Sequence, residues 1–279
     1  MTGQKIVLGD VDFGDSLALP VVRNHALQTN GSLFLVDFAS ATGALAAAPV
    51  NGSSVYNFAH DTAIGMVGSG TEASMAGSFE VRALARDALV ELSGKGGLHI
   101  LYSQLNNDTA NRGIFMHLPE AVRAYIVANK GHTFGTAIWK RRTRIAKNAG
   151  LVYASLGAAP DYLQIFNGVA PYARVGTVFN SAGAGRNVVG NQLVTLCGNA
   201  NGFAVNTSSY VLWGNSGPNN SFLNTAPGDL LYLMHVEDLT VSGVTEAQFH
   251  ARHYEAWGEA FAEGGRLFGD TWTDPATFP

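Results

Sequence analysis

The chain has 279 residues, of which only 14% are charged, and its formal net charge is −4. Ordinary soluble domains carry roughly 25% charged residues, and the absence of a basic stripe here argues against nucleic-acid binding. The single cysteine, Cys197, excludes an intrachain disulfide framework and a cysteine-based zinc site. No basic start precedes an apolar segment, and no apolar run reaches the ~18 residues of a membrane span. We therefore expect synthesis in a cytoplasm and no membrane insertion.

The N-terminal quarter differs from the rest of the chain. In residues 1–75, short apolar pieces are separated by Gly, Asp, Asn and Ser, which predicts an N-terminal arm or anchoring segment with short strands. Residues 65–77 are rich in glycine and serine and poor in bulky side chains. We interpret this stretch as a linker or a long loop.

Residues 76–241 have the pattern of a β domain. Apolar or alternating segments are separated by turns rich in Gly, Asn and Pro, and no strand–helix–strand alternation occurs. Many short strands with such turns predict an antiparallel β-sandwich or barrel, here a jelly-roll sandwich. The predicted strands cover residues 97–105, 131–145, 151–156, 162–166, 192–197, 203–205, 209–213 and 229–236.

Two helices interrupt the predicted strands. The first covers residues 119–130, and the second covers residues 245–263, where Thr245 and Gln248 form a capping box. Apolar or aromatic side chains recur every four residues along the second helix, which makes it amphipathic. We expect this stripe to pack against the sandwich or a neighbouring subunit, so that residues 242–279 form a C-terminal helix and packed tail. The stripe consists of Phe249, His253, Trp257 and Phe261.

Basic residues gather in one place only. Lys140, Arg141, Arg142, Arg144 and Lys147 follow one another at the end of the strand predicted for residues 131–145. We interpret the alternating part as the solvent-facing side of a strand end. The alternative is a patch that binds phosphate or an acidic glycan.

Signatures of catalysis are missing. The nearest match to the GxSxG elbow of serine hydrolases is Gly214-Asn215-Ser216-Gly217, which is one residue short and lies in a predicted turn. Sandwich-fold glycosidases place two carboxylates on one side of a strand, whereas Glu237 and Asp238 are adjacent and would face opposite sides. We therefore predict no catalytic residues and no enzyme activity.

Metal and cofactor motifs are also missing. His250 and His253 lie one helical turn apart, a spacing that could share a metal, but His253 belongs to the apolar stripe. We expect His253 to be packed and hydrogen-bonded instead. Asp161, Tyr162 and Asn167 could belong to a lectin-like calcium loop, but the further carboxylates of such a loop cannot be placed. The sequence predicts no cofactor and no metal.

One group of side chains suits a ligand. Aromatic rings and amides are combined around a predicted loop, as in sites that hold neutral glycans by stacking and hydrogen bonds. The alternative is a core strand followed by a turn. This candidate glycan or partner contact consists of Tyr210, Trp213, Asn215, Asn219 and Asn220.

The order of features resembles that of a known family. A glycine- and asparagine-rich β region around "HTFGTAIWKRRTR" precedes "DLLYLMHVEDLTVSG", and the tail "AQFHARHYEAWGEAFAEGGRLFGDTWTDPATFP" follows. Residues 79–279 together resemble tailed-bacteriophage virion proteins built on a concanavalin-like, laminin-G-like jelly roll. The resemblance implies a sandwich displayed outward and an N-terminal segment anchored in the particle. A collagen-like or coiled-coil stalk is missing, which favours a compact component over a long fibre.

Our first hypothesis is therefore a non-enzymatic virion structural protein: a decoration, baseplate or tail-tip/fibre component. A surface poor in charge suits permanent contacts. We expect it to form a homo-oligomer, to contact other virion proteins, and to display a neutral surface that either binds a host glycan or simply covers the particle. Two alternatives stay open: a soluble bacterial lectin-like carbohydrate-binding module, and a sandwich-fold polysaccharide-degrading enzyme.

Overall fold

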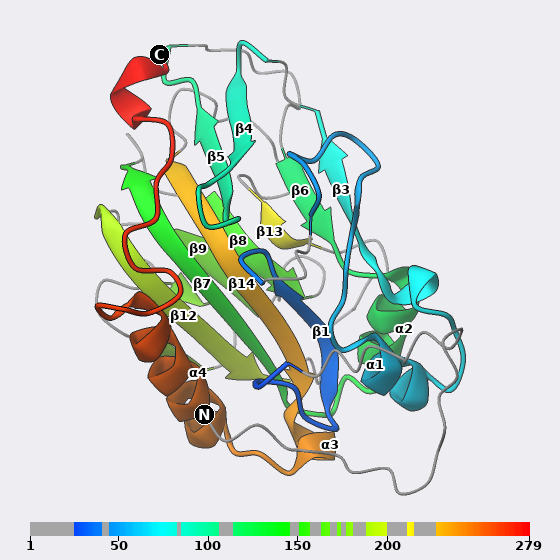
Figure 1. The fold of residues 1–279 in the computed structure, drawn as a ribbon. Coiled ribbons are helices and arrows are strands. Elements are labelled where there is room, and N and C mark those ends of the chain that lie inside the picture. The colour runs from blue at the N-terminus through cyan, green and yellow to red at the C-terminus, as the bar shows by residue number, and fades with distance from the viewer. Residues whose placement is uncertain are drawn as a thin grey trace, which may run out of the picture.

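The computed structural model describes residues 25–40, 45–82, 85–105, 114–145, 188–199 and 227–279, together with the backbone of strands within 151–156, 163–167, 172–173, 177–180 and 211–214. The described part of the chain is mainly β, with few helices (Figure 1). Its strands are β1 (Ser32–Asp37), β2 (Ser54–Val55), β3 (Gly77–Val81), β4 (Ala88–Leu92), β5 (Leu98–Tyr102), β6 (Ile114–His117), β7 (Phe134–Arg144), β8 (Leu151–Leu156), β9 (Leu163–Asn167), β10 (Tyr172–Ala173), β11 (Thr177–Asn180), β12 (Gly190–Gly198), β13 (Val211–Gly214) and β14 (Gly228–Asp238). Its α-helices are α1 (His60–Val67), α2 (Glu120–Ala128), α3 (Leu239–Ser242) and α4 (Glu246–Phe261), and short 3-10 turns cover Ala73–Met75 and Pro275–Thr277.

The strands pair antiparallel in three sheets. The large sheet has seven strands in the order β11-β12-β7-β14-β5-β4, with β1 also paired to β14. Both β5 and β1 use the same edge of β14: β5 pairs with Gly228–Leu231 and β1 with the following part of the strand. The other two sheets have the orders β13-β6-β3-β2 and β10-β9-β8. The predicted antiparallel, mainly β architecture is confirmed.

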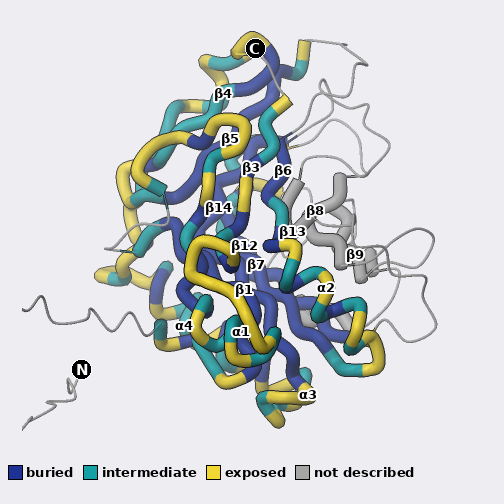
Figure 2. Tube along the Cα trace, turned by 90° about the vertical axis from the view of Figure 1, so that its right-hand side faces the viewer, coloured by how far each residue is buried: buried dark blue, intermediate teal, exposed yellow. Residues whose placement is uncertain are grey.

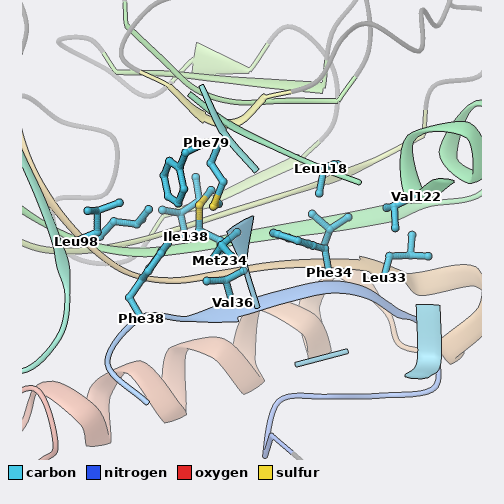
Figure 3. Close-up of a cluster of buried hydrophobic side chains, with 14 of the residues drawn as sticks. Leu33, Phe34, Val36, Phe38, Phe79, Leu98, Leu118, Val122, Ile138 and Met234 are labelled. Atoms are coloured by element: carbon cyan, nitrogen blue, oxygen red, sulfur yellow. The ribbon is translucent and has the colours of Figure 1, made fainter. Parts of the chain in front are cut away.

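The main hydrophobic core lies between the large sheet and the four-stranded sheet. Phe34, Val36, Ile138 and Met234 of the large sheet meet Phe79 of β3 there (Figure 3). Helix α2 closes this core with Val122 and Ile126, which are one turn apart on one face of the helix. We call this side of the large sheet its inner face.

Helix α4 and the C-terminal tail, residues 264–279, cover the opposite, outer face (Figure 1). Residues Trp139, Leu193 and Leu233 of the sheet pack there against Ala260 of α4 and Leu267 of the tail. In Figure 2 the central strands are buried, whereas α1 and α4 carry exposed segments at the surface. The predicted capping box is present at the start of α4, where Thr245 and Gln248 bond each other's backbone N–H groups.

Two β-bulges interrupt the pairing of β7 with β14. The register passes from Gly228↔Arg144 to Asp229↔Arg142, which leaves Thr143 as an extra residue on β7. It passes from Leu231↔Lys140 to Leu233↔Trp139, which leaves Tyr232 as an extra residue on β14. Because bulges change the direction in which neighbouring side chains point, Tyr232 and Leu233 both belong to the outer hydrophobic cluster.

The N-terminal region departs from the sequence interpretation in two places. Residues 32–37, which we assigned to an arm, form β1 inside the large sheet, and all six are buried. Residues 65–77 do not form an open linker, since they include the end of α1, a 3-10 turn and the start of β3. The fully buried Met75 anchors this stretch in the core. Residues 1–24 lie outside the described residues.

Candidate functional site

A pocket of about 220 Å³ opens on the outer face, between the large sheet, the end of α4 and the tail. Three strands, one helix and the tail contribute to its wall, so that no single segment of the sequence contains the site. The lining residues are Arg141, Asn191, Tyr232, Phe261, Leu267, Phe268, Gly269, Asp270 and Trp272.

The sheet contributes a polar pair and a tyrosine to the pocket. Arg141 of β7 and Asn191 of β12 are cross-strand partners, and Nη1 of Arg141 donates a hydrogen bond to Oδ1 of Asn191 over 2.9 Å. Tyr232 faces the pocket because of the bulge in β14, and its ring meets that of Phe261 edge-on with centroids 5.2 Å apart. Burial, and then the neighbouring carboxylate of Asp270, raise the pKa of Tyr232 far above its ordinary value, so that its hydroxyl stays protonated.

Asp270 fixes the tail to the sheet. Its Oδ2 accepts hydrogen bonds from the Ser93 hydroxyl over 2.6 Å and from the Tyr232 hydroxyl over 2.9 Å. Its Oδ1 accepts from the backbone N–H groups of Lys95 and Thr271, each over 2.8 Å. Two of these donors, Ser93 and Lys95, belong to the turn between β4 and β5, and Tyr232 belongs to β14, so that the carboxylate holds the tail beside both.

Two aromatic rings of the tail complete the pocket. The guanidinium carbon of Arg141 lies 5.0 Å from the centroid of the Trp272 ring, which is a cation–π contact. Phe268, at the rim, is 51% exposed. The pocket therefore combines aromatic faces with an arginine, an amide and a carboxylate.

The adjoining part of the tail is held by a relay of side chains. Thr143, the bulged residue of β7, reaches across β14 to His99 of β5, with 3.0 Å between Oγ1 and Nε2. Gly228 leaves room for this contact, since a Cβ there would lie only 2.6 Å from Oγ1 of Thr143. His99 bonds Glu91 through Nδ1 over 2.8 Å, and Glu91 accepts from both the backbone N–H and the hydroxyl of Thr273.

The relay has the order hydroxyl, imidazole, carboxylate that is known from hydrolase triads. Burial lowers the pKa of His99 despite its bond to Glu91, and for Glu91 the hydrogen bonds from His99 and Thr273 outweigh burial and lower the pKa. A neutral His99 then donates to Glu91 and accepts from Thr143. However, His99 is fully buried, neither it nor Thr143 lines the pocket, and Glu91 binds the tail with both oxygens. The relay therefore fixes Thr273, the residue that follows Trp272 in the tail.

A second polar network lies on the outer face beneath α4. Nε1 of Trp139 donates to Nδ1 of His253 over 3.2 Å, His253 and His235 share a bond of 3.0 Å, and Nε2 of His235 lies 2.9 Å from Oγ of Ser32. Because the Trp139 nitrogen can only donate, the proton of neutral His253 lies on Nε2 and that of His235 also on Nε2. We call these four residues the outer chain.

The outer chain is uncharged. All four members are almost fully buried, and burial lowers the pKa of both histidines well below the ordinary value, with Arg252 adding to the effect. Arg252 in turn pairs with the carboxylate of Glu237. This carboxylate is fully buried, and its Oε2 lies 3.8 Å from Nε2 of His235. The sequence-based expectation of a packed, hydrogen-bonded His253 is confirmed.

The interpretation of the basic patch as a solvent-facing strand end is wrong for two of its members. Lys140 and Arg142 are fully buried on the inner face and bond Asp229 of β14 at 3.3 and 2.8 Å. Burial and the nearby Arg142 lower the pKa of Lys140 to about 7, against the attraction of Asp229. The opposite face of the strand end carries Arg141 and is partly covered by the C-terminal tail. We call Lys140, Arg142 and Asp229 the inner cluster.

The glycan contact predicted from the sequence stays a prediction. Tyr210, Asn215, Asn219 and Asn220 lie outside the described residues, and for Trp213 only the backbone, within β13, is described. Among the described residues no group of three or more metal-ligating side chains is placed to hold an ion, and no helix is long and apolar enough to cross a membrane.

Sequence reasoning missed the outer-face pocket. The aromatic residues of the tail indicated that the tail packs against the domain. No pattern in the sequence indicated that Trp272 lies next to Arg141 and Asn191. Comparison with protein-family models, with curated proteins and with solved structures finds no match for this chain.

Proposed function

We propose that this chain is a non-enzymatic structural protein that binds a sugar in the outer-face pocket. The observation that carries this proposal is the combination of the rings of Tyr232 and Trp272 with the polar groups of Arg141 and Asn191 in one small pocket. Sugars present an apolar C–H face to aromatic rings and hydroxyls to amides and guanidinium groups. A volume of about 220 Å³ is below the usual range for drug-sized ligands and suits a single sugar ring.

We propose a bacteriophage virion as the setting, as a decoration, baseplate or tail-tip component. The resemblance of residues 79–279 to concanavalin-like virion proteins supports this setting. In this proposal the inner-face core is that of a jelly-roll sandwich, with α4 as an amphipathic helix packed on its outside. The low charge content, 14%, supports a homo-oligomer in contact with other virion proteins.

The sugar site is tested by a glycan array followed by titration calorimetry on the full chain. We expect Trp272→Ala to abolish binding, because the ring that the sugar stacks on is removed. The matched control is Trp213→Ala, in the cluster predicted from the sequence, which should leave binding intact. Melting temperatures of both variants verify that they fold.

Two results would overturn the proposed site. Binding that survives Trp272→Ala but is lost on Trp213→Ala would move the site to the sequence-predicted cluster. An array without any bound glycan would remove the sugar-binding function. Light scattering tests the structural role separately, since a monomer at every concentration would contradict a homo-oligomer.

A further inference from the structure

The pocket offers hydrogen-bond donors that have no acceptor. Arg141 uses only Nη1, toward Asn191, and its Nε is buried without a partner among the described residues. The amide of Asn191 has its oxygen occupied by Arg141, so that its Nδ2 group keeps two N–H donors for a ligand. Because Nε is covered, the donors that Arg141 offers to a ligand in the pocket are those on its two terminal nitrogens, which a carboxylate accepts well.

The acceptors of the same pocket are already occupied. Asp270 accepts four hydrogen bonds from Ser93, Tyr232, Lys95 and Thr271, two on each oxygen. The Tyr232 hydroxyl donates its hydrogen bond to Asp270. Because the one carboxylate is saturated by groups that fix the tail, it offers little to a ligand that donates hydrogen bonds.

We propose that the ligand is a sugar that carries a carboxylate, held by Arg141 and Asn191 with its ring against Trp272. This inference rests on the proposed function and narrows it from sugars in general to acidic sugars. A neutral sugar would leave the guanidinium without an anionic partner in a pocket whose other charge, Asp270, is engaged elsewhere. Several donors that converge on one pocket without an acceptor favour an anionic ligand, because a carboxylate accepts hydrogen bonds from more than one of them.

The test compares two probes that differ only in the anionic group, the methyl glycosides of glucuronic acid and of glucose. Their dissociation constants are measured by titration calorimetry on the full chain at low and at high salt. We expect the carboxylated probe to bind about tenfold or more tighter, because hydrogen bonds between charged groups are the stronger ones. This preference should shrink at high salt, where charges are screened.

Variants assign the preference to Arg141. Arg141→Gln should remove the difference between the two probes, while Arg86→Gln, at an exposed arginine far from the pocket in sequence, should leave it unchanged. Melting temperatures show whether Arg141→Gln still folds, and Asn191→Ala provides a second, milder reduction of the same preference.

The outcomes separate this inference from the proposed function. Equal or tighter binding of the neutral probe, still abolished by Trp272→Ala, would overturn the acidic-sugar inference and leave the pocket as a sugar site. A preference for the carboxylated probe that survives Arg141→Gln would also overturn the inference. Failure of both probes and of the wider array would overturn the proposed function itself.

Discussion

The inner cluster and the outer chain are both buried in the large sheet, on its opposite faces, but they are held by different interactions. The inner cluster joins two basic side chains, Lys140 and Arg142, to the carboxylate of Asp229. The outer chain is neutral, and each of its bonds depends on which nitrogen carries a proton. One sheet thus buries polar groups in two ways: the inner cluster depends on the charge of the Asp229 carboxylate, and the outer chain depends on two histidines that stay neutral.

The largest effect should come from removing the carboxylate of the inner cluster. Asp229→Asn keeps the size of the side chain but leaves Lys140 and Arg142 buried beside a neutral amide. Breaking a buried ion pair by removing one partner costs about 3–5 kcal/mol. We expect a loss of this size in the free energy of unfolding, measured by urea denaturation.

The control for this variant is Asp61→Asn, which removes a carboxylate whose side chain is 87% exposed. Exposed ion pairs contribute about 0–1 kcal/mol, so little change is expected. If Asp229→Asn also changed the unfolding free energy by less than about 1 kcal/mol, Asp229 would not be what stabilises the buried cations.

The outer chain should make stability fall in acid. His235 and His253 have pKa values well below the ordinary value of 6.5 in the folded chain, so below pH 6.5 the unfolded chain binds protons that the folded chain does not. Stability then decreases as the pH is lowered, by about 1.4 kcal/mol per pH unit for each histidine. Urea denaturation between pH 7 and pH 5 measures this slope.

His253→Gln should reduce the slope by about one histidine's share, because glutamine does not titrate. Ser74→Ala, in an exposed turn, removes no titratable group and is the control, which should leave the slope unchanged. The same slope in His253→Gln and in the parent protein would show that the outer chain does not cause the acid sensitivity.

A smaller effect should follow from shortening the outer chain at its end. Ser32→Ala removes the hydroxyl that accepts from His235 and leaves a buried N–H without a partner. Such a group costs about 1–3 kcal/mol. Ser74→Ala, in an exposed turn, is the matched control, with a change of less than about 0.5 kcal/mol. Equal losses in the two variants would contradict a directional chain.

The sequence predicted the parts of the fold that depend on local patterns. The alternation in residues 131–145 and the capping box of Thr245 each depend on neighbouring residues, and both correspond to described elements. The burial of Lys140 and Arg142 could not be predicted, because it depends on Asp229, which comes from a different part of the chain. The pocket was missed for the same reason, since its wall combines distant segments that only the folded sheet brings together.

The bulge at Tyr232 has a consequence for how β14 tolerates insertions and deletions. Asp229 and His235 are separated by an even number of positions, so a regular strand would direct both to one side of the sheet. The extra residue shifts the alternation by one position. Asp229, before the bulge, therefore faces the inner cluster, and His235, after it, faces the outer chain. Deleting Tyr232 would therefore remove the bulge and keep Asp229 and His235 on their present faces, whereas a register slip that paired Tyr232 as a regular residue would direct His235 into the apolar core.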